Sequence, residues 1–172
     1  MDQRAALEFE HMVDELRQEI EELEQAIYSD VVLREARDPK NVGRMDDADL
    51  QGIVQGWCGD TMEIYLRLRD DGSTRSPRSA GEGEQALIIE EATFVTDGCG
   101  ATLACGSMLT QMVTGASMKR ADSILPKDLI NALDGLPEES MHCAGLAIST
   151  LQNAIFNWRM GQEELGVEEE TA

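Results

Sequence analysis

The start of the chain carries apolar side chains at alternating intervals of three and four positions, and Glu and Arg fill most of the positions between them. The apolar residues are Ala6, Phe9, Val13, Leu16, Ile20, Leu23 and Ile27. This spacing is the seam of a heptad repeat, so it predicts one amphipathic helix over residues 1–29. We expect this helix either to pack on its own domain or to bind a partner, such as a second copy of the chain.

The middle of the chain changes to a period of two. Residues 62–68 alternate apolar and polar side chains and predict an amphipathic strand. Residues 87–89 and 92–96 predict further strand, antiparallel to the first. Between them, residues 73–84 are rich in Ser, Gly and Pro and predict a mobile loop. Turn signals in residues 28–49 predict irregular structure there.

Helical spacing returns in the second half. It predicts a helix from just after Cys99 to near Gly115, a short helix over 126–133 and a long one over 141–158. Strands followed by helices indicate the α+β class. We therefore expect a small antiparallel sheet packed by helices on one side, with the N-terminal helix as an addition.

Three segments are expected in the chain. Residues 1–29 form the heptad-patterned helix, residues 30–160 form the main domain, and residues 161–172 form an acidic, flexible tail.

Charge and hydropathy narrow the classes of partner. The formal net charge is −20, from 34 acidic and 14 basic side chains, and such a chain repels phosphate, so no nucleic acid is expected. No stretch approaches the roughly 20 apolar residues that cross a bilayer, so no membrane contact is expected. The charged N-terminus lacks the apolar region of a signal peptide, which favours a cytoplasmic location.

Three of the four cysteines lie where elements are predicted to begin or end. Cys58 lies in Gly-Trp-Cys-Gly-Asp before a strand, Cys99 lies in Gly-Cys-Gly before a helix, and Cys143 follows His142 near the start of the last helix. A helix N-terminus favours thiolate, so Cys99 and Cys143 are expected to ionise more easily than a core cysteine. Thiolates prefer zinc, copper(I) or iron–sulfur centres.

Residue types and spacing alone do not decide what these cysteines bind, or whether they bind a metal at all. Three thiolates with His142 or Asp60 would complete four ligands for zinc or a [2Fe–2S] cluster, but the long spacing fits buried structural thiols as well. Cys105 lies six residues beyond Cys99 on a helix and therefore on another face, which predicts a core position. Trp57 is expected to pack over the site and shield it from water.

Four motifs together resemble the iron–sulfur scaffold IscU and the N-terminal domain of NifU. Asn41-Val-Gly, Cys58-Gly-Asp, Gly98-Cys-Gly and His142-Cys occur in the order of that family, and the resemblance covers about residues 28–158. The segment Leu136-Pro-Glu-Glu-Ser-Met-His-Cys is closer to NifU than to IscU. It lacks the lysine of the IscU segment that binds a dedicated chaperone, so chaperone dependence is not implied.

The resemblance implies a scaffold, not an enzyme, that assembles a [2Fe–2S] cluster from iron and from sulfur supplied by a cysteine desulfurase, and passes it to apo-proteins. It implies Cys58, Cys99 and Cys143 as ligands, Asp60 as the residue that keeps the cluster labile, and His142 as an adjacent ligand or a proton-handling group. Cys143 is then the sulfur acceptor, and purified chains hold zinc at the same residues. The alternative is a zinc-dependent sulfurtransferase similar to SufU. The short run from Gly115 to Ser140 argues against it.

Overall fold

Three strands form one antiparallel sheet in the order β1-β2-β3 in this computed structural model, which describes residues 3–70 and 87–167. They are β1 (Leu50–Gln55), β2 (Thr61–Asp70) and β3 (Leu87–Thr96). Met62 pairs with Val54 on one side and with Thr96 on the other. The β1–β2 turn and the end of β3 therefore lie at the same end of the sheet. Both predicted strands are confirmed, β1 was not predicted, and the loop predicted at 73–84 lies outside the described residues.

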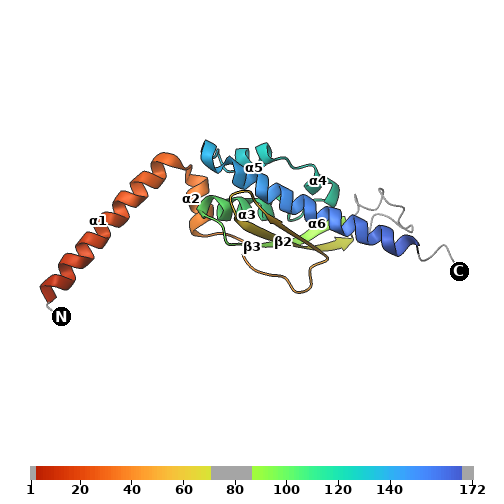
Figure 1. Ribbon diagram of the computed structural model, residues 1–172, viewed down its shortest axis with the longest axis horizontal. Coiled ribbons are helices and arrows are strands. Elements are labelled where there is room, and N and C mark those ends of the chain that lie inside the picture. Colours follow the sequence, from red (N-terminus) through yellow and green to blue (C-terminus); the bar gives the residue numbers. More distant parts are fainter. Residues whose placement is uncertain (1–2, 71–86, 168–172) are drawn as a thin grey trace.

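The helices that follow cover one side of this sheet, as Figure 1 shows. They are α3 (Gly100–Val113), α4 (Met118–Asp122), α5 (Pro126–Ala132), the 3-10 turn η2 (Glu138–Ser140) and α6 (Met141–Val167). Helix α6 packs mainly on β1, and α3 packs on β3. This arrangement confirms the α+β class and the one-sided packing. Helix α6 extends to Val167, into the segment expected as a tail, and residues 168–172 lie outside the described ranges.

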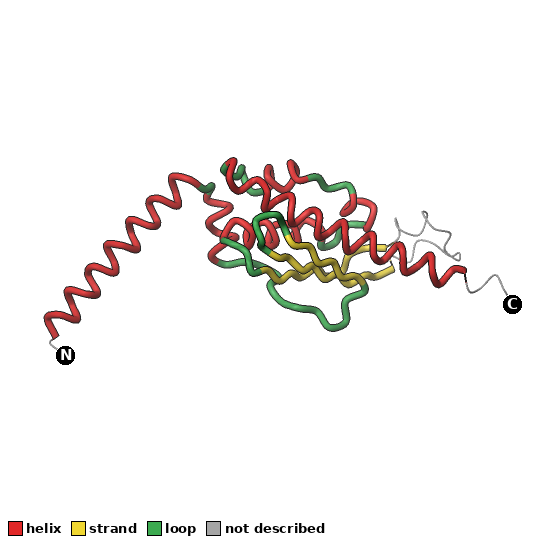
Figure 2. The backbone as a smooth tube through the Cα atoms, viewed as in Figure 1, coloured by secondary structure: helices red, strands yellow, loops and turns green. Residues whose placement is uncertain are grey.

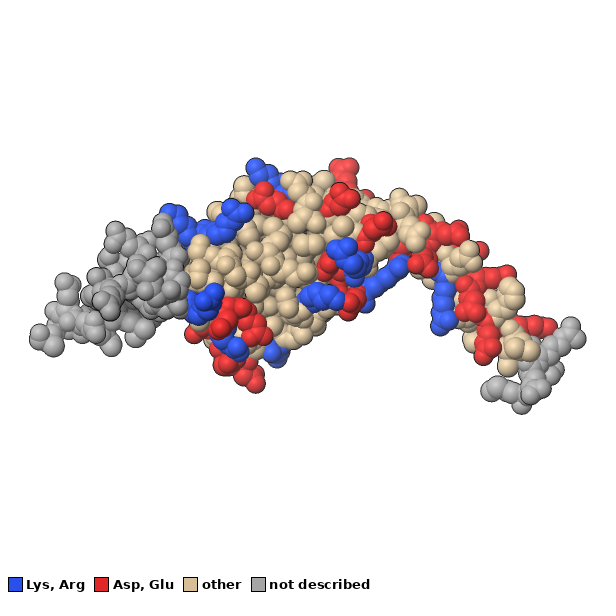
Figure 3. Space-filling view, turned by 180° about the vertical axis from the view of Figure 1, so that it is seen from behind, with Lys and Arg blue, Asp and Glu red and all other residues tan. Residues whose placement is uncertain are grey.

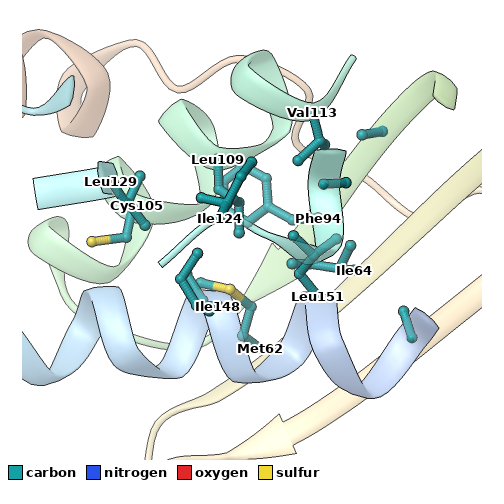
Figure 4. Close-up of a cluster of buried hydrophobic side chains, with 14 of the residues drawn as sticks. Met62, Ile64, Phe94, Cys105, Leu109, Val113, Ile124, Leu129, Ile148 and Leu151 are labelled. Atoms are coloured by element: carbon teal, nitrogen blue, oxygen red, sulfur yellow. The ribbon is translucent and has the colours of Figure 1, made fainter. Parts of the chain in front are cut away.

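The core lies between the sheet and these helices (Figure 4). Phe94 and Met62 are fully buried on the sheet, and Leu109 of α3 and Leu151 of α6 are buried against them. Cys105 lies in the same core and is fully buried, as its helical position predicts. Burial of apolar side chains on this scale is the main stabilising contribution to the domain. It also gives α3 and α6 fixed positions above the sheet.

Helix α2 (Asp30–Arg37) lies where the sequence predicts irregular structure, so that prediction is wrong. The Ser29 side chain caps it by accepting a hydrogen bond from the Val32 N–H. Its Glu35 is buried against α3, where Ser107 donates a hydrogen bond of 2.6 Å and Gln111 donates one of 2.8 Å. Residues 38–49, the turn-rich part of the prediction, do form a long loop between α2 and β1 (Figure 2).

Helix α1 (Gln3–Ile27) projects away from the rest of the chain (Figures 1 and 3). Its base is held by Arg37, which forms ion pairs with Glu21 at 3.1 Å and Glu24 at 3.0 Å. Just beyond it, the Tyr28 hydroxyl lies 3.2 Å from Ser140 Oγ. The predicted helix is confirmed, but its apolar seam is exposed, so the expectation that it packs on its own domain is wrong.

No helix within the described ranges is both long enough and apolar enough to span a membrane.

Candidate functional site

Two loops meet at the end of the sheet where β1 turns into β2 and β3 leads into α3. The first loop carries Cys58 and Asp60, and the second carries Cys99. They are joined directly, because the Thr61 N–H donates a hydrogen bond of 2.6 Å to Asp97 Oδ1. The strand pairing therefore places the Cys-Gly-Asp and Gly-Cys-Gly motifs side by side.

The Cys58 loop is a tight turn closed by backbone hydrogen bonds. The Gly56 N–H donates to the Asp60 carbonyl at 2.8 Å, and the Gly59 N–H donates to the Gly56 carbonyl at 3.0 Å. Gly59 has φ +96°, a left-handed conformation that favours glycine. This turn leaves Cys58 exposed while Asp60 is half-buried and faces the second loop.

The Thr102 hydroxyl lies among three of the predicted site residues. Its Oγ1 is 3.0 Å from Asp60 Oδ2, 3.4 Å from Cys143 Sγ and 3.5 Å from Cys99 Sγ. One hydroxyl hydrogen serves one acceptor at a time; the Asp60 carboxylate is the nearest acceptor, and either sulfur can take the hydrogen when it is ionised. Thr102 is fully buried, so it links the β1–β2 turn, α3 and α6 below the surface.

Gly98 leaves the room that this arrangement needs. A Cβ at position 98 would lie 2.6 Å from Asp60 Oδ2 and 2.7 Å from the Thr102 Cβ, closer than such atoms approach. The Gly98 N–H also donates a hydrogen bond of 3.1 Å to Thr96 Oγ1. The first glycine of Gly-Cys-Gly is therefore required by close packing against Asp60.

Cys99 is the N-cap residue of α3 and is exposed. Partial burial raises the pKa of its thiol, but hydrogen bonds from the Thr102 hydroxyl and from the Thr102 and Ala101 N–H groups outweigh it, so the net pKa is lowered. This confirms the expectation that Cys99 ionises easily.

Cys143 behaves differently, and the expectation that it ionises easily is wrong. It is 1% exposed, and burial raises the pKa of its thiol to about 11, with the Thr102 hydroxyl partly opposing the rise. The charges of Cys99 and Cys58 raise it further, which places both of these sulfurs within electrostatic range of Cys143. Burial also raises the pKa of Cys105. The helix terminus does not offset the desolvation of Cys143.

His142 lies between Cys143 and Trp57. Its Nε2 is 3.6 Å from Cys143 Sγ, and the Trp57 and His142 ring centroids are 4.9 Å apart with planes tilted by 53°. Trp57 is 85% exposed, so the expectation that it shields the site from water is wrong. The ring contact instead joins the Cys58 loop to the start of α6.

The site is not closed around a metal ion. Within residues 3–70 and 87–167, no group of three or more His, Cys, Asp and Glu side chains is arranged to hold one. Asp60, Cys99 and Cys143 instead surround the Thr102 hydroxyl, whose Oγ1 lies 3.0–3.5 Å from each of them.

Sequence reasoning missed Thr102 and gave no close-packing reason for Gly98. A signal for Thr102 was present, because it follows Cys99 by three residues in the first turn of a helix. Side chains at that spacing share a face, and they point back toward the helix start.

The sequence is similar to known proteins over most of its length. The sequence model of the NifU-like N terminal domain matches residues 27–164. The chain is 36% identical over 151 residues to the iron–sulfur cluster assembly scaffold protein IscU 1 of Archaeoglobus fulgidus, covering 84% of this chain and 88% of that protein. It is 31% identical over 141 residues to IscU of Escherichia coli, covering 79% of this chain and 97% of that protein.

The fold is also found in a solved structure, the N-terminal NifU-like protein of Brucella abortus. The TM-score is 0.54 at 18% identity, covering 85% of this chain and 96% of that one.

Proposed function

The chain belongs to the family of NifU-like N-terminal domains, and from this premise we propose that it is a scaffold for assembling an iron–sulfur cluster and transferring it to apo-proteins. Relatives that it matches over most of their length are named as such scaffold proteins. The observation that carries the proposal is the convergence of Asp60, Cys99 and Cys143 on the Thr102 hydroxyl. The cluster is cargo, so the chain is a carrier and not an enzyme.

The ligands of the proposed cluster are Cys58, Cys99 and Cys143, with Asp60 and His142 beside them. Three thiolates suit a soft metal centre, and a carboxylate oxygen is a weaker ligand for such a centre. We propose a [2Fe–2S] cluster on these residues, with Asp60 keeping it labile, and zinc at the same residues in purified protein. The oxygen ligand supports a role in transfer, because a site with one weak ligand opens more easily than a site made of thiolates alone.

The proposed partners are a cysteine desulfurase, which supplies sulfur, and apo-proteins, which receive the cluster. Cys143 is the proposed sulfur acceptor. In that step its thiolate attacks the outer sulfur of the desulfurase persulfide and forms a new S–S bond. The old S–S bond breaks, and the desulfurase cysteine leaves as a thiolate.

The burial and raised pKa of Cys143 add a condition to this step. A buried thiol does not reach a second protein, so side chains around Cys143 must first move. The turn that carries Trp57 and Cys58 contacts the start of α6 through the Trp57 and His142 rings. We propose that docking of the desulfurase displaces this contact, with the reactions taking place in the cytoplasm.

Anaerobic reconstitution with iron, sulfide and a desulfurase tests the function. We expect a [2Fe–2S] absorption spectrum that is lost in Cys58→Ala, Cys99→Ala and Cys143→Ala. Cys105→Ala is the matched control, because this buried cysteine faces the core and the spectrum should survive its loss. Asp60→Ala should slow transfer of the cluster to an apo-ferredoxin.

Two results would contradict the proposal. Tightly bound zinc with no cluster and no transfer would favour the zinc-dependent sulfurtransferase instead. Survival of the spectrum in all three single variants would show that the cluster binds elsewhere.

A further inference from the structure

Helix α1 presents an apolar stripe that the rest of the described chain leaves uncovered. Its five bulky seam residues are each more than half exposed: Phe9, Leu16, Ile20, Leu23 and Ile27. With Ala6 and Val13 the stripe covers three heptads, enough for a coiled coil. We propose that α1 pairs with the α1 of a second copy of this chain as an antiparallel, two-stranded coiled coil. This inference is independent of what the cysteine site binds.

The residues of the seam point to a helical partner. Val13 and Ile20 occupy a positions, and Leu16 and Leu23 occupy d positions, so aliphatic side chains fill the centre of the seam, as in a coiled coil. A helix that lies on a membrane surface is rich in Lys and Arg on its polar face. Helix α1 instead carries eight acidic and two basic residues, which anionic lipid repels.

The charges beside the seam select the orientation. In a parallel pair, Arg17 of each copy would face the partner's Met12, and Glu19 would face the partner's Glu24, so no opposite charges would meet across the seam. In an antiparallel pair of full overlap, Arg17 lies beside the partner's Glu10, and the same contact repeats on the other side. Glu19 then lies beside the partner's Met12, so no like charges face each other across the seam.

Glu24 needs no partner from the second copy, because Arg37 of its own chain already binds it at 3.0 Å. The same guanidinium binds Glu21 at 3.1 Å. This clamp neutralises part of the acidic end of α1 and fixes the helix relative to α2. In the antiparallel pair each of these charges therefore has an opposite charge beside it: Glu10 and Arg17 from the two copies, and Glu24 with Arg37 of its own chain.

The same alignment matches the sizes of the seam residues. Ala6 lies opposite the partner's Leu23, and Val13 lies opposite the partner's Leu16, so each of these contacts pairs a smaller with a larger side chain, and Phe9 lies opposite the partner's Ile20. At 1.5 Å per residue the 25-residue helix is about 38 Å long. The domains then lie at opposite ends of the pair, clear of one another, because α1 projects from one end of each domain (Figure 1).

Sedimentation of the full chain tests whether a second copy covers the apolar stripe of α1. We expect a dimer, and we expect the double substitution Leu16→Gln with Ile20→Gln to give a monomer. Leu7→Gln is the matched control, because Leu7 is 65% exposed on the same helix but outside the seam, so the dimer should persist. A full chain that sediments as a monomer at the highest soluble concentration overturns the proposal, as does a dimer that survives the seam substitutions.

Charge reversal tests the orientation without disturbing the seam. Arg17→Glu and Glu10→Arg should each raise the dimer dissociation constant on the order of tenfold, because two attractive contacts become repulsive. The double reversal restores both contacts at the original net charge and should restore the affinity. Arg17 also lies 3.2 Å from Asp14 of its own helix, and that contact is lost both in Arg17→Glu and in the double variant. Failure of the double reversal to restore the affinity rules out the antiparallel pair.

Discussion

The Thr102 hydroxyl donates a hydrogen bond of 3.0 Å to Asp60 Oδ2, and this bond holds the carboxylate of the Cys-Gly-Asp turn against the first turn of α3. The same oxygen lies within 3.5 Å of the sulfurs of Cys99 and Cys143. Thr102 therefore sets the resting positions of three proposed cluster ligands.

Replacing Thr102 by Val removes the hydroxyl at nearly equal volume. Asp60 then loses a buried donor, so the free energy of unfolding should fall by about 2 kcal/mol, the usual contribution of a hydrogen bond to a charged group. The pKa of Cys99 should rise, because the hydroxyl helps to lower it. Denaturant unfolding and the pH dependence of Cys99 alkylation measure the two effects.

Thr102→Ser is the control for that experiment. It keeps the hydroxyl and should keep the low pKa of Cys99, with a smaller loss of stability from the missing methyl group. If Val and Ser shift the alkylation profile equally, the hydroxyl does not set the ionisation of Cys99.

Thiol labelling should separate the cysteines by position. At neutral pH we expect a small alkylating reagent to modify Cys99 and Cys58, which are exposed, well before Cys143 and Cys105, which are buried. The lowered pKa of Cys99 gives it thiolate at lower pH, whereas the Cys143 thiol, with its pKa near 11, stays protonated. Peptide mapping by mass spectrometry at increasing pH gives the order, and early labelling of Cys143 would contradict the buried position.

Two glycines of one motif should respond oppositely to the same substitution. Gly98→Ala puts a methyl group 2.6 Å from Asp60 Oδ2, and the resulting shift of packed atoms should cost about 1–3 kcal/mol of stability. Gly100→Ala meets only the Ala36 Cβ at 3.6 Å and lies at the start of a helix, so it should be neutral or slightly stabilising. Thermal unfolding of the two variants is the measurement, and equal losses would contradict the close packing at Gly98.

Glu35 should make part of the stability depend on pH. Burial raises the pKa of its carboxyl, but hydrogen bonds from Ser107, Gln111 and Arg34 outweigh burial and lower it below the ordinary value of 4.5. A lowered pKa stabilises the fold above the unfolded value, and this contribution is lost as the pH falls through the folded value. Glu35→Gln should therefore be less stable at neutral pH, by about 2 kcal/mol, and lose less on acidification.

Glu90→Gln is the matched control, because Glu90 lies exposed on β3. Its stability should stay within about 0.5 kcal/mol of the parent chain at neutral pH. Urea unfolding at a series of pH values compares the three chains. An acid response of Glu35→Gln identical to that of the parent would exclude a role for the Glu35 carboxylate.

The long periodic segments and the short helix α5 were predictable from sequence, whereas α2 and β1 were not. Helices α1, α3 and α6 and strand β2 repeat their pattern often enough to show a buried face. Helix α2 has eight residues, and its buried Glu35 breaks the apolar pattern. The partner that makes this burial favourable, Ser107, lies 72 residues away in sequence, so no local signal contains it.

For the site as well, the sequence located residues but did not reveal properties that depend on the folded structure. Motifs located Cys58, Cys99 and Cys143 and their loops, because motif order is a property of the sequence. The difference in ionisation between Cys99 and Cys143 depends on burial in the folded chain, which the shared helix-start position does not reveal. Trp57 was misjudged for a related reason, since its single ring contact with His142 leaves most of its surface open.

Gly98 also limits how this sequence can evolve. Every amino acid reached from a glycine codon by one base change carries a Cβ, and at position 98 that atom would collide with Asp60 Oδ2 and Thr102. Every single substitution of Gly98 is therefore expected to be destabilising while Asp60 and Thr102 keep their places. A lineage could replace Gly98 only after one of those two residues had changed, so the order of mutations, and not only their identity, is constrained at this site.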